Sequence, residues 1–295
     1  MAFFKNLLTC ALAFSSIAAA RPTRRQAPAL TDLQILQFAL TLEHLEATFY
    51  KEGFAKFPAS DFKALGLDDA TIAGLVSIGE TEATHVTVLQ QTITSLGGSP
   101  VPACTYNFNL IDAASMVATA RILEAVGISA YLGAAPLVSA KAVLSAAASI
   151  VTVEARHQTF IRASLKALPV PQAFDVAVGA RQIFTLASQF IVACPKEADL
   201  GLAAFAPLNV LDAGNVRAGS TLKMVVTDPT GGAGMSCSFT SGEKGLQFAK
   251  FENGGCVVPE GLGGEVFMTV TTESAGVTAL SDDKIVAGPA VLVLS

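Results

Sequence analysis

Apolar residues recur at helical spacing from Leu30 to about Cys194, and this pattern stops before Pro207. Apolar positions three and four residues apart predict amphipathic helices. Thr31 suits an N-cap, as does either Asp68 or Asp69, and the glycines at positions 53 and 97–98 suit helix ends. The segments that we expect to be helical are 31–53, 68–98, 112–136, 137–168 and 171–194. All are apolar on more than one face, which is typical of helices in a compact bundle.

Residues 206–295 have a different pattern. Short runs that alternate or are rich in β-branched residues are separated by Gly-rich turns such as PTGGAG and ENGGC. This pattern predicts a small sandwich of about six or seven strands. The expected fold is therefore an all-α four-helix bundle with an extra C-terminal helix over residues 28–195, followed by a small all-β sandwich domain over residues 206–295.

Composition limits the partners of the chain. With 295 residues, 52% of them hydrophobic, it has room for two domains with buried cores. Only 15% of the residues are charged, and the net charge is −5. No basic stripe for nucleic acid and no polybasic segment for an anionic membrane is present in the sequence.

The N-terminal segment MAFFKNLLTCALAFSSIAAA has a lysine, a short apolar run and a small-residue ending, which predicts a signal peptide over residues 1–20. We expect the dibasic pair Arg24-Arg25 to be cut, which removes a propeptide over residues 21–25. The predicted location is extracellular, in the medium or the cell wall. The apolar run is too short for a transmembrane segment, and we expect none elsewhere.

Four cysteines lie outside the predicted signal: Cys104, Cys194, Cys237 and Cys256. An even number in an exported chain favours disulfides, and three pairings are possible. We favour Cys104–Cys194 and Cys237–Cys256, because each pair then lies within one predicted domain. No C-x-x-C spacing is present, which disfavours a thiolate zinc site.

Two segments, ETEATHVTVL and TVEARHQTF, each place a glutamate three residues before a histidine. Residues three apart share one face of a helix, so Glu82 points with His85 and Glu154 points with His157. Their helical neighbours are apolar, which predicts that both pairs face the core. An ionised carboxylate there costs several kcal/mol unless it is paired or binds a metal.

The other two long helices carry a matching pattern. LEHLEATFY contains Glu43 and Tyr50, and LEAVGISAY contains Glu124 and Tyr131, and in both cases the tyrosine lies seven positions after the glutamate. The chain therefore contains an internal repeat of a helix pair. A bundle with pseudo-twofold symmetry would bring four glutamates and two histidines together at its centre.

This set suits two iron or manganese ions, since carboxylates can bridge two ions and imidazole binds each without adding charge. The predicted ligands are Glu43, Glu82, His85, Glu124, Glu154 and His157. Glu46 is an alternative to Glu43, although the repeat favours Glu43, because Glu46 aligns with Gly127.

Residues 30–194 resemble the ferritin-like fold and, within it, the secreted fungal group described as stress-response and late-sexual-development proteins. The β domain has no counterpart in ferritin cages, so a storage shell is not expected. The resemblance implies that Glu82 and Glu154 bridge the ions, that Glu43 with His85 completes one ion and Glu124 with His157 the other, and that Tyr50, with Tyr131 as its pseudo-symmetric partner, lies beside the centre.

We therefore expect a secreted dimetal-carboxylate protein that performs oxygen or peroxide redox chemistry in a stress or developmental context. Tyr50 or Tyr131 would pass an electron or a proton. The alternative is a non-catalytic structural or protective extracellular protein with a vestigial site, in which Arg121 and Arg156 neutralise the carboxylates and the β domain binds a cell-wall polymer or a protein. A glycoside hydrolase is disfavoured, because the carboxylates share a face with histidines. Whether the chain is an enzyme stays open at this stage.

Overall fold

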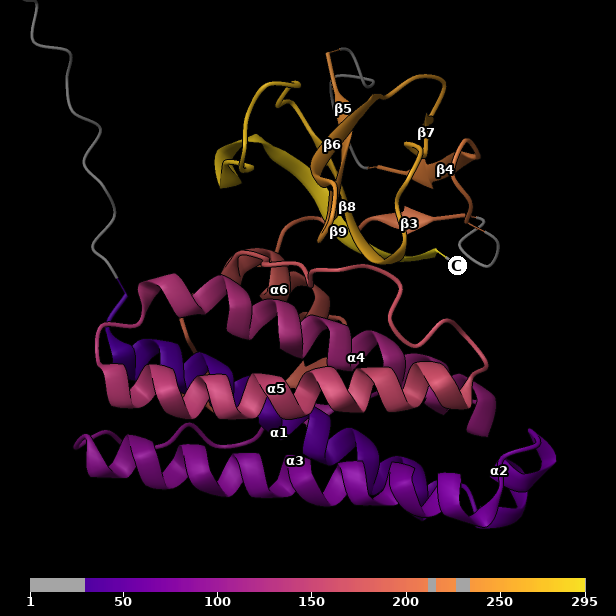
Figure 1. The fold of residues 1–295 in the computed structure, drawn as a ribbon. Helices are drawn as coiled ribbons and strands as arrows, with labels where there is room; N and C mark the ends of the chain where they lie inside the picture. The colour runs from indigo at the N-terminus through magenta and orange to yellow at the C-terminus, as the bar shows by residue number, and fades with distance from the viewer. Residues whose placement is uncertain (1–29, 212–215, 227–233, 295) are drawn as a thin grey trace, which may run out of the picture.

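The computed structural model describes residues 30–211, 216–226 and 234–294, which form a helical layer and a β layer stacked on it (Figure 1). The predicted signal peptide, 1–20, and propeptide, 21–25, lie outside the described residues. Helix α6 lies between α4 and the strands, where it contacts β9 (Figure 1). This arrangement confirms the predicted fold class.

Four long helices form the bundle. α1 packs against α3 and α4 packs against α5, so the bundle consists of two helix hairpins, as the internal repeat predicts. A shorter helix, α2, follows α1, and α6 lies across the side of α4. The helices are α1 Asp32–Lys56, α2 Ala59–Ala64, α3 Asp69–Ser95, α4 Ala113–Ala134, α5 Lys141–Ser164 and α6 Ala180–Ser188.

Side-chain caps fix where these helices begin. Thr31 forms a capping box with Gln34 at the start of α1, and the Asp68 side chain accepts a hydrogen bond from the Thr71 amide at α3. α5 has no side-chain cap of its own. Instead, the Asp32 carboxylate accepts hydrogen bonds from the Ser139 and Ala140 amides, at 2.7 and 2.8 Å. The first hairpin therefore holds the segment that leads into α5, just before this helix begins.

The fifth predicted helix, 171–194, is too long, because only α6 within it is helical. Residues before α6 form an irregular segment that is held against α4, where the Val178 amide donates to Ser129 O at 3.1 Å. The approach is close: a Cβ at Gly133 would lie 2.0 Å from Val178 O. Residues after α6 form β2 (Ile191–Ala193), which pairs with β1 (Thr105–Tyr106) beside the Cys104–Cys194 disulfide. Tertiary contacts here override a helical pattern.

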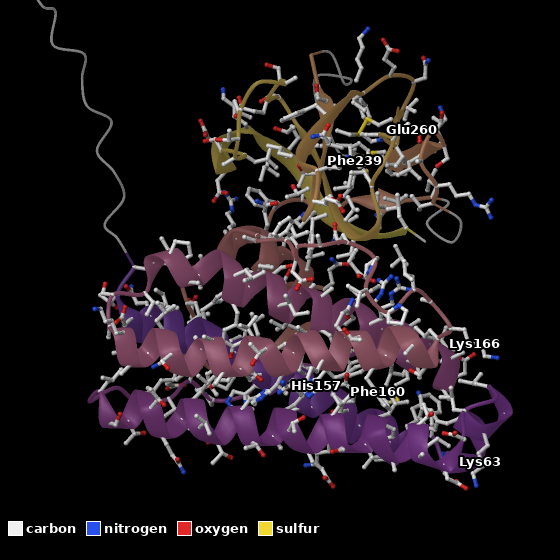
Figure 2. The ribbon with its side chains drawn as sticks, viewed as in Figure 1. Lys63, His157, Phe160, Lys166, Phe239 and Glu260 are labelled. Atoms are coloured by element: carbon white, nitrogen blue, oxygen red, sulfur yellow. A yellow bond between two sulfur atoms is a disulfide. The ribbon has the colours of Figure 1, made fainter. Side chains whose placement is uncertain are left out.

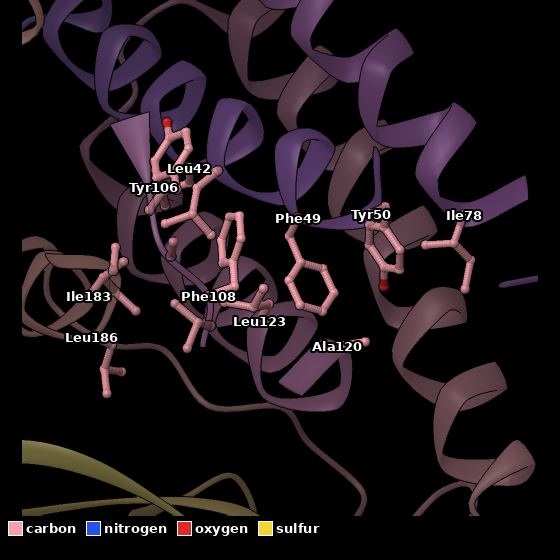
Figure 3. Packing of buried hydrophobic residues seen from close by; sticks show 14 of the residues in the cluster. Leu42, Phe49, Tyr50, Ile78, Tyr106, Phe108, Ala120, Leu123, Ile183 and Leu186 are labelled. Carbon is pink, nitrogen blue, oxygen red and sulfur yellow. The ribbon is translucent and has the colours of Figure 1, made fainter. Parts of the chain in front are cut away.

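A row of aromatic side chains fills the core between the hairpins (Figure 3). The Phe49 ring contacts Tyr50 and Phe108 edge-on, with ring centroids 5.2 and 5.3 Å apart. Such edge-to-face pairs add stability beyond the area that they bury. The row places the Tyr50 hydroxyl group inside the bundle.

The β layer consists of two antiparallel sheets, of order β3-β4-β7 and β6-β5-β8-β9. The Cys237–Cys256 disulfide joins β5 in one sheet to β7 in the other, and both sheets contribute to one hydrophobic cluster. The two disulfides have the pairing that the sequence favours. The strands are β3 Asn209–Val210, β4 Thr221–Val225, β5 Ser236–Ser241, β6 Gly245–Lys250, β7 Gly255–Val257, β8 Gly264–Thr271 and β9 Ile285–Leu294.

One described helical stretch, Ala113–Leu137, is long and apolar enough to cross a membrane by length and composition alone. In this fold 72% of its most apolar window is buried inside the protein. Its apolar faces contact α5, α1 and α6. A core position in the bundle accounts for this composition.

A buried ion-pair network connects the β layer to the bundle. Glu265 on β8 accepts hydrogen bonds from Arg162 Nη1 at 2.6 and 2.7 Å and from Arg121 Nε at 2.5 Å. The side chains of Glu265, Arg121 and Arg162 are about nine-tenths buried or more. Because Arg121 lies on α4 and Arg162 on α5, a single carboxylate from the β layer connects these two helices.

We predict that Glu265→Ala lowers stability by about 3–5 kcal/mol, because it leaves two buried guanidinium groups without their partner. The melting temperature should fall by roughly 10 °C in differential scanning fluorimetry. Glu243→Ala is the matched control, since Glu243 lies on the same domain, is exposed, and loses the same charge. Equal melting temperatures for the two variants would contradict this role of Glu265.

Candidate metal centre

The six predicted ligand residues meet at the middle of the bundle. Each of the four long helices contributes, and Figure 2 shows His157 of α5 facing α3. The carboxyl groups of Glu82, Glu124 and Glu154 are completely buried, and Glu43 is 1% exposed. The residues that meet are Glu43 from α1, Glu82 and His85 from α3, Glu124 from α4, and Glu154 and His157 from α5.

The cluster consists of two overlapping groups of four residues, and in each group the candidate ligand atoms lie within 4.8 Å of one another. Both groups contain Glu82 and Glu154. One is completed by Glu43 and His85, the other by Glu124 and His157. The two groups thus share two carboxylates and differ in their other two residues. This is the arrangement of ligands around two bridged cations in a carboxylate bundle.

Nδ1 is the ring nitrogen of both histidines that faces the carboxylates. His85 Nδ1 lies 3.0 Å from Glu154 Oε1, 3.2 Å from Glu82 Oε2 and 3.4 Å from Glu43 Oε2. His157 Nδ1 lies 2.8 Å from Glu82 Oε1 and 3.3 Å from Glu124 Oε2. One proton on one nitrogen cannot satisfy three carboxylates, whereas a metal ion accepts several ligands at once.

The balance of buried charge also favours a cation. Burial raises the pKa of Glu43 to about 8, and raises the pKa values of Glu46 and Glu154 well above their ordinary range. Glu82 is the exception: although burial opposes ionisation, hydrogen bonds to His157 and His85 lower its pKa to about 2. Without a metal, therefore, the cluster must retain protons to remain buried.

Buried polar atoms without a hydrogen-bond partner mark the same place. Among the described residues they include Glu43 Oε2, Glu82 Oε1, Glu124 Oε2, both oxygens of Glu154, and His157 Nδ1. Such atoms are rare in folded proteins and call for an explanation. These six atoms all belong to the two four-residue groups, so the donor set fits metal ions on the chemistry of this structure alone.

Arginines do not neutralise the cluster. The Arg121 guanidinium donates to Glu265 of the β layer, and Arg156 is exposed. The pairing that a vestigial site would need is therefore absent for both arginines within the described part of the chain.

Two tyrosines brace the outer glutamates across the bundle. The Tyr50 hydroxyl group on α1 donates to Glu124 Oε1 on α4, and the Tyr131 hydroxyl group on α4 donates to Glu43 Oε1 on α1, the latter at 2.5 Å. In both glutamates, Oε2 remains free and faces a histidine Nδ1. Burial and the adjacent carboxyl group raise the pKa of both tyrosines well above the usual value, so each hydroxyl stays protonated as a donor.

Thr81 is a residue of this site that the sequence did not single out. Its hydroxyl group donates to Ile78 O at 2.7 Å and lies 2.9 Å from His157 Nε2. Because the threonine proton is used, His157 Nε2 must be the donor, so Nδ1 is the nitrogen that would bind a metal ion once His157 loses its second proton. The position before the second motif is Val153, which offers no such acceptor. A hydroxyl residue just before Glu-x-x-His is the signal that could have identified Thr81.

Glu46 is 3% exposed and lies beside the cluster, but in neither four-residue group. Its place depends on Gly127 of α4: a Cβ there would lie 2.9 Å from Glu46 Oε1 and 3.6 Å from Glu154 Oε2. The repeat thus places a glycine opposite the additional glutamate, and this glycine leaves the space that the Glu46 carboxyl group occupies.

We predict that the metal-free protein loses stability as the pH rises above about 5. The pKa values of His85 and His157 are raised from 6.5 to about 12 and about 10, so their contribution is complete below 6.5 and is lost toward those values. Glu43, raised from 4.5 to about 8, acts in the same direction, because the native state retains a proton that the unfolded chain releases. Glu82, lowered to about 2, stabilises above 4.5 and loses this effect in acid.

The measurement is the melting temperature of metal-free protein between pH 4 and pH 10, with an expected maximum near pH 5 and a fall of several degrees by pH 9. Glu43→Gln, which resembles the protonated carboxyl group, should have a flatter profile between pH 5 and 8. A melting temperature that rises toward pH 9 would contradict the prediction.

Comparison with known proteins agrees with this geometry. Residues 31–167 match the family model described as a ferritin-like domain. A protein of Schizosaccharomyces pombe named Protein rds1 is 27% identical over 167 residues, which cover 56% of this chain and 40% of that protein. The chain thus spans less than half the length of this relative. The residues that match the ferritin-like domain model, 31–167, contain all six residues of the cluster.

Proposed function

We propose that this chain binds two iron or manganese ions at the centre of its bundle and uses them for redox chemistry with oxygen or peroxide. The observation that carries the proposal is the pair of overlapping four-residue groups that share Glu82 and Glu154. The excess of buried carboxyl groups over imidazoles supports it, because bound cations would remove the cost of burying them.

Ligand chemistry favours iron or manganese over other metals. Each group offers three carboxylates and one imidazole, whereas structural zinc sites usually contain thiolates, and calcium and magnesium sites contain oxygen ligands only. When bound, a pair of redox-active ions would supply electrons to oxygen or peroxide. Oxidase, peroxide-scavenging and ferroxidase activities all belong to this class.

The residues of the chain have separate tasks in this proposal. Glu82 and Glu154 would be shared by the two ions, while Glu43 with His85 would hold one ion and Glu124 with His157 the other. Glu46, beside the groups, is an alternative ligand. Tyr50 and Tyr131 hold the outer carboxylates in place and, as the buried hydroxyl groups that bond to them, can pass an electron or a proton.

The proposed setting is extracellular. Two disulfides fit an oxidising compartment. The predicted signal peptide and the resemblance to secreted fungal stress proteins support the same setting. In this proposal the β layer also binds a cell-wall polymer or a protein, which would hold the redox centre where it is needed.

The test is metal analysis of the purified protein and of the double variant Glu82→Gln/Glu154→Gln. We expect about two iron or manganese ions per chain in the native protein and almost none in the variant, because both bridging carboxylates are lost. Glu80→Gln is the control, since Glu80 is exposed on the same helix and loses the same charge. No bound metal in the native protein, even after anaerobic loading with iron(II) and manganese(II), would overturn the proposal.

We further predict that Thr81→Val weakens binding of one ion by roughly 10- to 100-fold, because it removes the acceptor that holds Nε2–H of His157. Competition with a chelator measures this, and binding of the ion at His85 should change little. Thr84→Val is the control, since its hydroxyl group bonds only to Glu80 O on the same helix. Equal affinities for the two variants would contradict the role of Thr81.

A further inference from the structure

A cavity of about 190 Å³ lies where α1, α4 and α6 meet the β layer. Its walls are mostly apolar: Leu42 and Leu45 of α1, Val126 of α4 and Leu186 of α6. The β layer covers it with Leu208, Ala290 and Val291. Gln189, which is exposed, lies at its rim. The β layer therefore forms one wall of the cavity, and the bundle with α6 forms the rest.

One wall of the cavity is polar. Glu46 and Gly127 line it at the point nearest the metal cluster. Neither oxygen of Glu46 has a hydrogen bond or an ion pair to any described residue. Only 3% of the Glu46 surface is exposed. The Glu46 oxygens are not among the fully enclosed atoms of the cluster, and the residue lines the cavity, where a ligand that donates a hydrogen bond can reach it.

Cavity size limits the ligand. A protein cavity of about 150 Å³ lined by aliphatic side chains holds one benzene molecule. This cavity is slightly larger, so it has room for a single six-membered ring with one small substituent. The apolar walls favour the ring, and Glu46 favours a substituent that donates a hydrogen bond.

We propose that this cavity is a binding site for a small monocyclic aromatic molecule with one hydroxyl or amino group, held by a hydrogen bond to Glu46 and covered by the β layer. Glu46 lies between the cavity and the metal cluster, so the polar end of the ligand points toward the cluster. The suggestion that the ligand is a substrate of the metal centre rests on the proposed function. Binding of the ligand in the cavity does not depend on it.

The experiment is calorimetric titration of the metal-free protein with phenol and with benzene, repeated on metal-loaded protein. We expect phenol to bind at least tenfold more tightly than benzene, since a hydrogen bond to a carboxyl group separates them. Ala290→Leu fills the cavity from the β layer and should weaken phenol binding at least tenfold. Ala275→Leu, at an exposed position in the same domain, should leave it unchanged.

The variant Glu46→Leu tests the polar wall of the cavity. We expect it to bind benzene as the native protein does and to lose the preference for phenol. Circular dichroism checks that each variant is folded. The proposal is overturned if the native protein binds no phenol at about 10 mM, or if Ala290→Leu binds phenol as the native protein does. Metal content is measured on the same samples. Phenol binding by a protein that takes up no metal even after loading would contradict only the proposed function, and metal uptake without phenol binding would contradict only the cavity site.

Discussion

The structure depends on the burial of five carboxyl groups, Glu43, Glu46, Glu82, Glu124 and Glu154, in one small volume with only two imidazoles. In a medium of low dielectric constant, such a group of charges would force the helices apart unless protons or cations neutralised it. The bundle can remain closed in two ways, with retained protons or with bound metal. The same constraint explains the raised pKa values, the buried atoms without partners, and the fit to a metal pair.

The pseudo-twofold repeat places half of the buried cluster on each helix hairpin. The repeat is not exact, so the two halves of the cluster differ. Tyrosines bond to the glutamate of the opposite hairpin in both directions, so each hairpin orients a ligand of the other. Symmetry fails where Thr81 corresponds to Val153, and where Glu46 corresponds to Gly127. The first departure fixes one histidine and leaves the other freer. The second opens the cluster toward the side that the β layer covers. The two four-residue groups are therefore chemically inequivalent.

Much of the fold and the candidate cluster could be predicted from the chain, because both depend on local periodicity. The Glu-x-x-His spacing is a property of one helix turn, so Glu82 with His85 needs no tertiary information. The longer helices, capped by residues such as Thr31 and Asp68, are predictable for the same reason. What depends on contacts between distant segments was not predictable. The fifth helix was placed too long, because the irregular segment before α6 is held by α4 at Gly133. The partner of Arg121 lies 144 residues away in the sequence, which no local pattern shows.

The ion pairs between the β layer and the bundle help to hold the helices that carry the candidate ligands. Arg121 is one helical turn from Glu124 on α4, and Arg162 follows His157 on α5 by five residues. Glu265 binds both arginines, so it fixes the relative position of the two helices that carry Glu124, Glu154 and His157. Ligand positions in a carboxylate centre depend on such supporting contacts. A ferritin-like bundle without this layer would need another way to hold α4 against α5. In this chain the β layer provides that support, and it also covers the cavity that leads to Glu46.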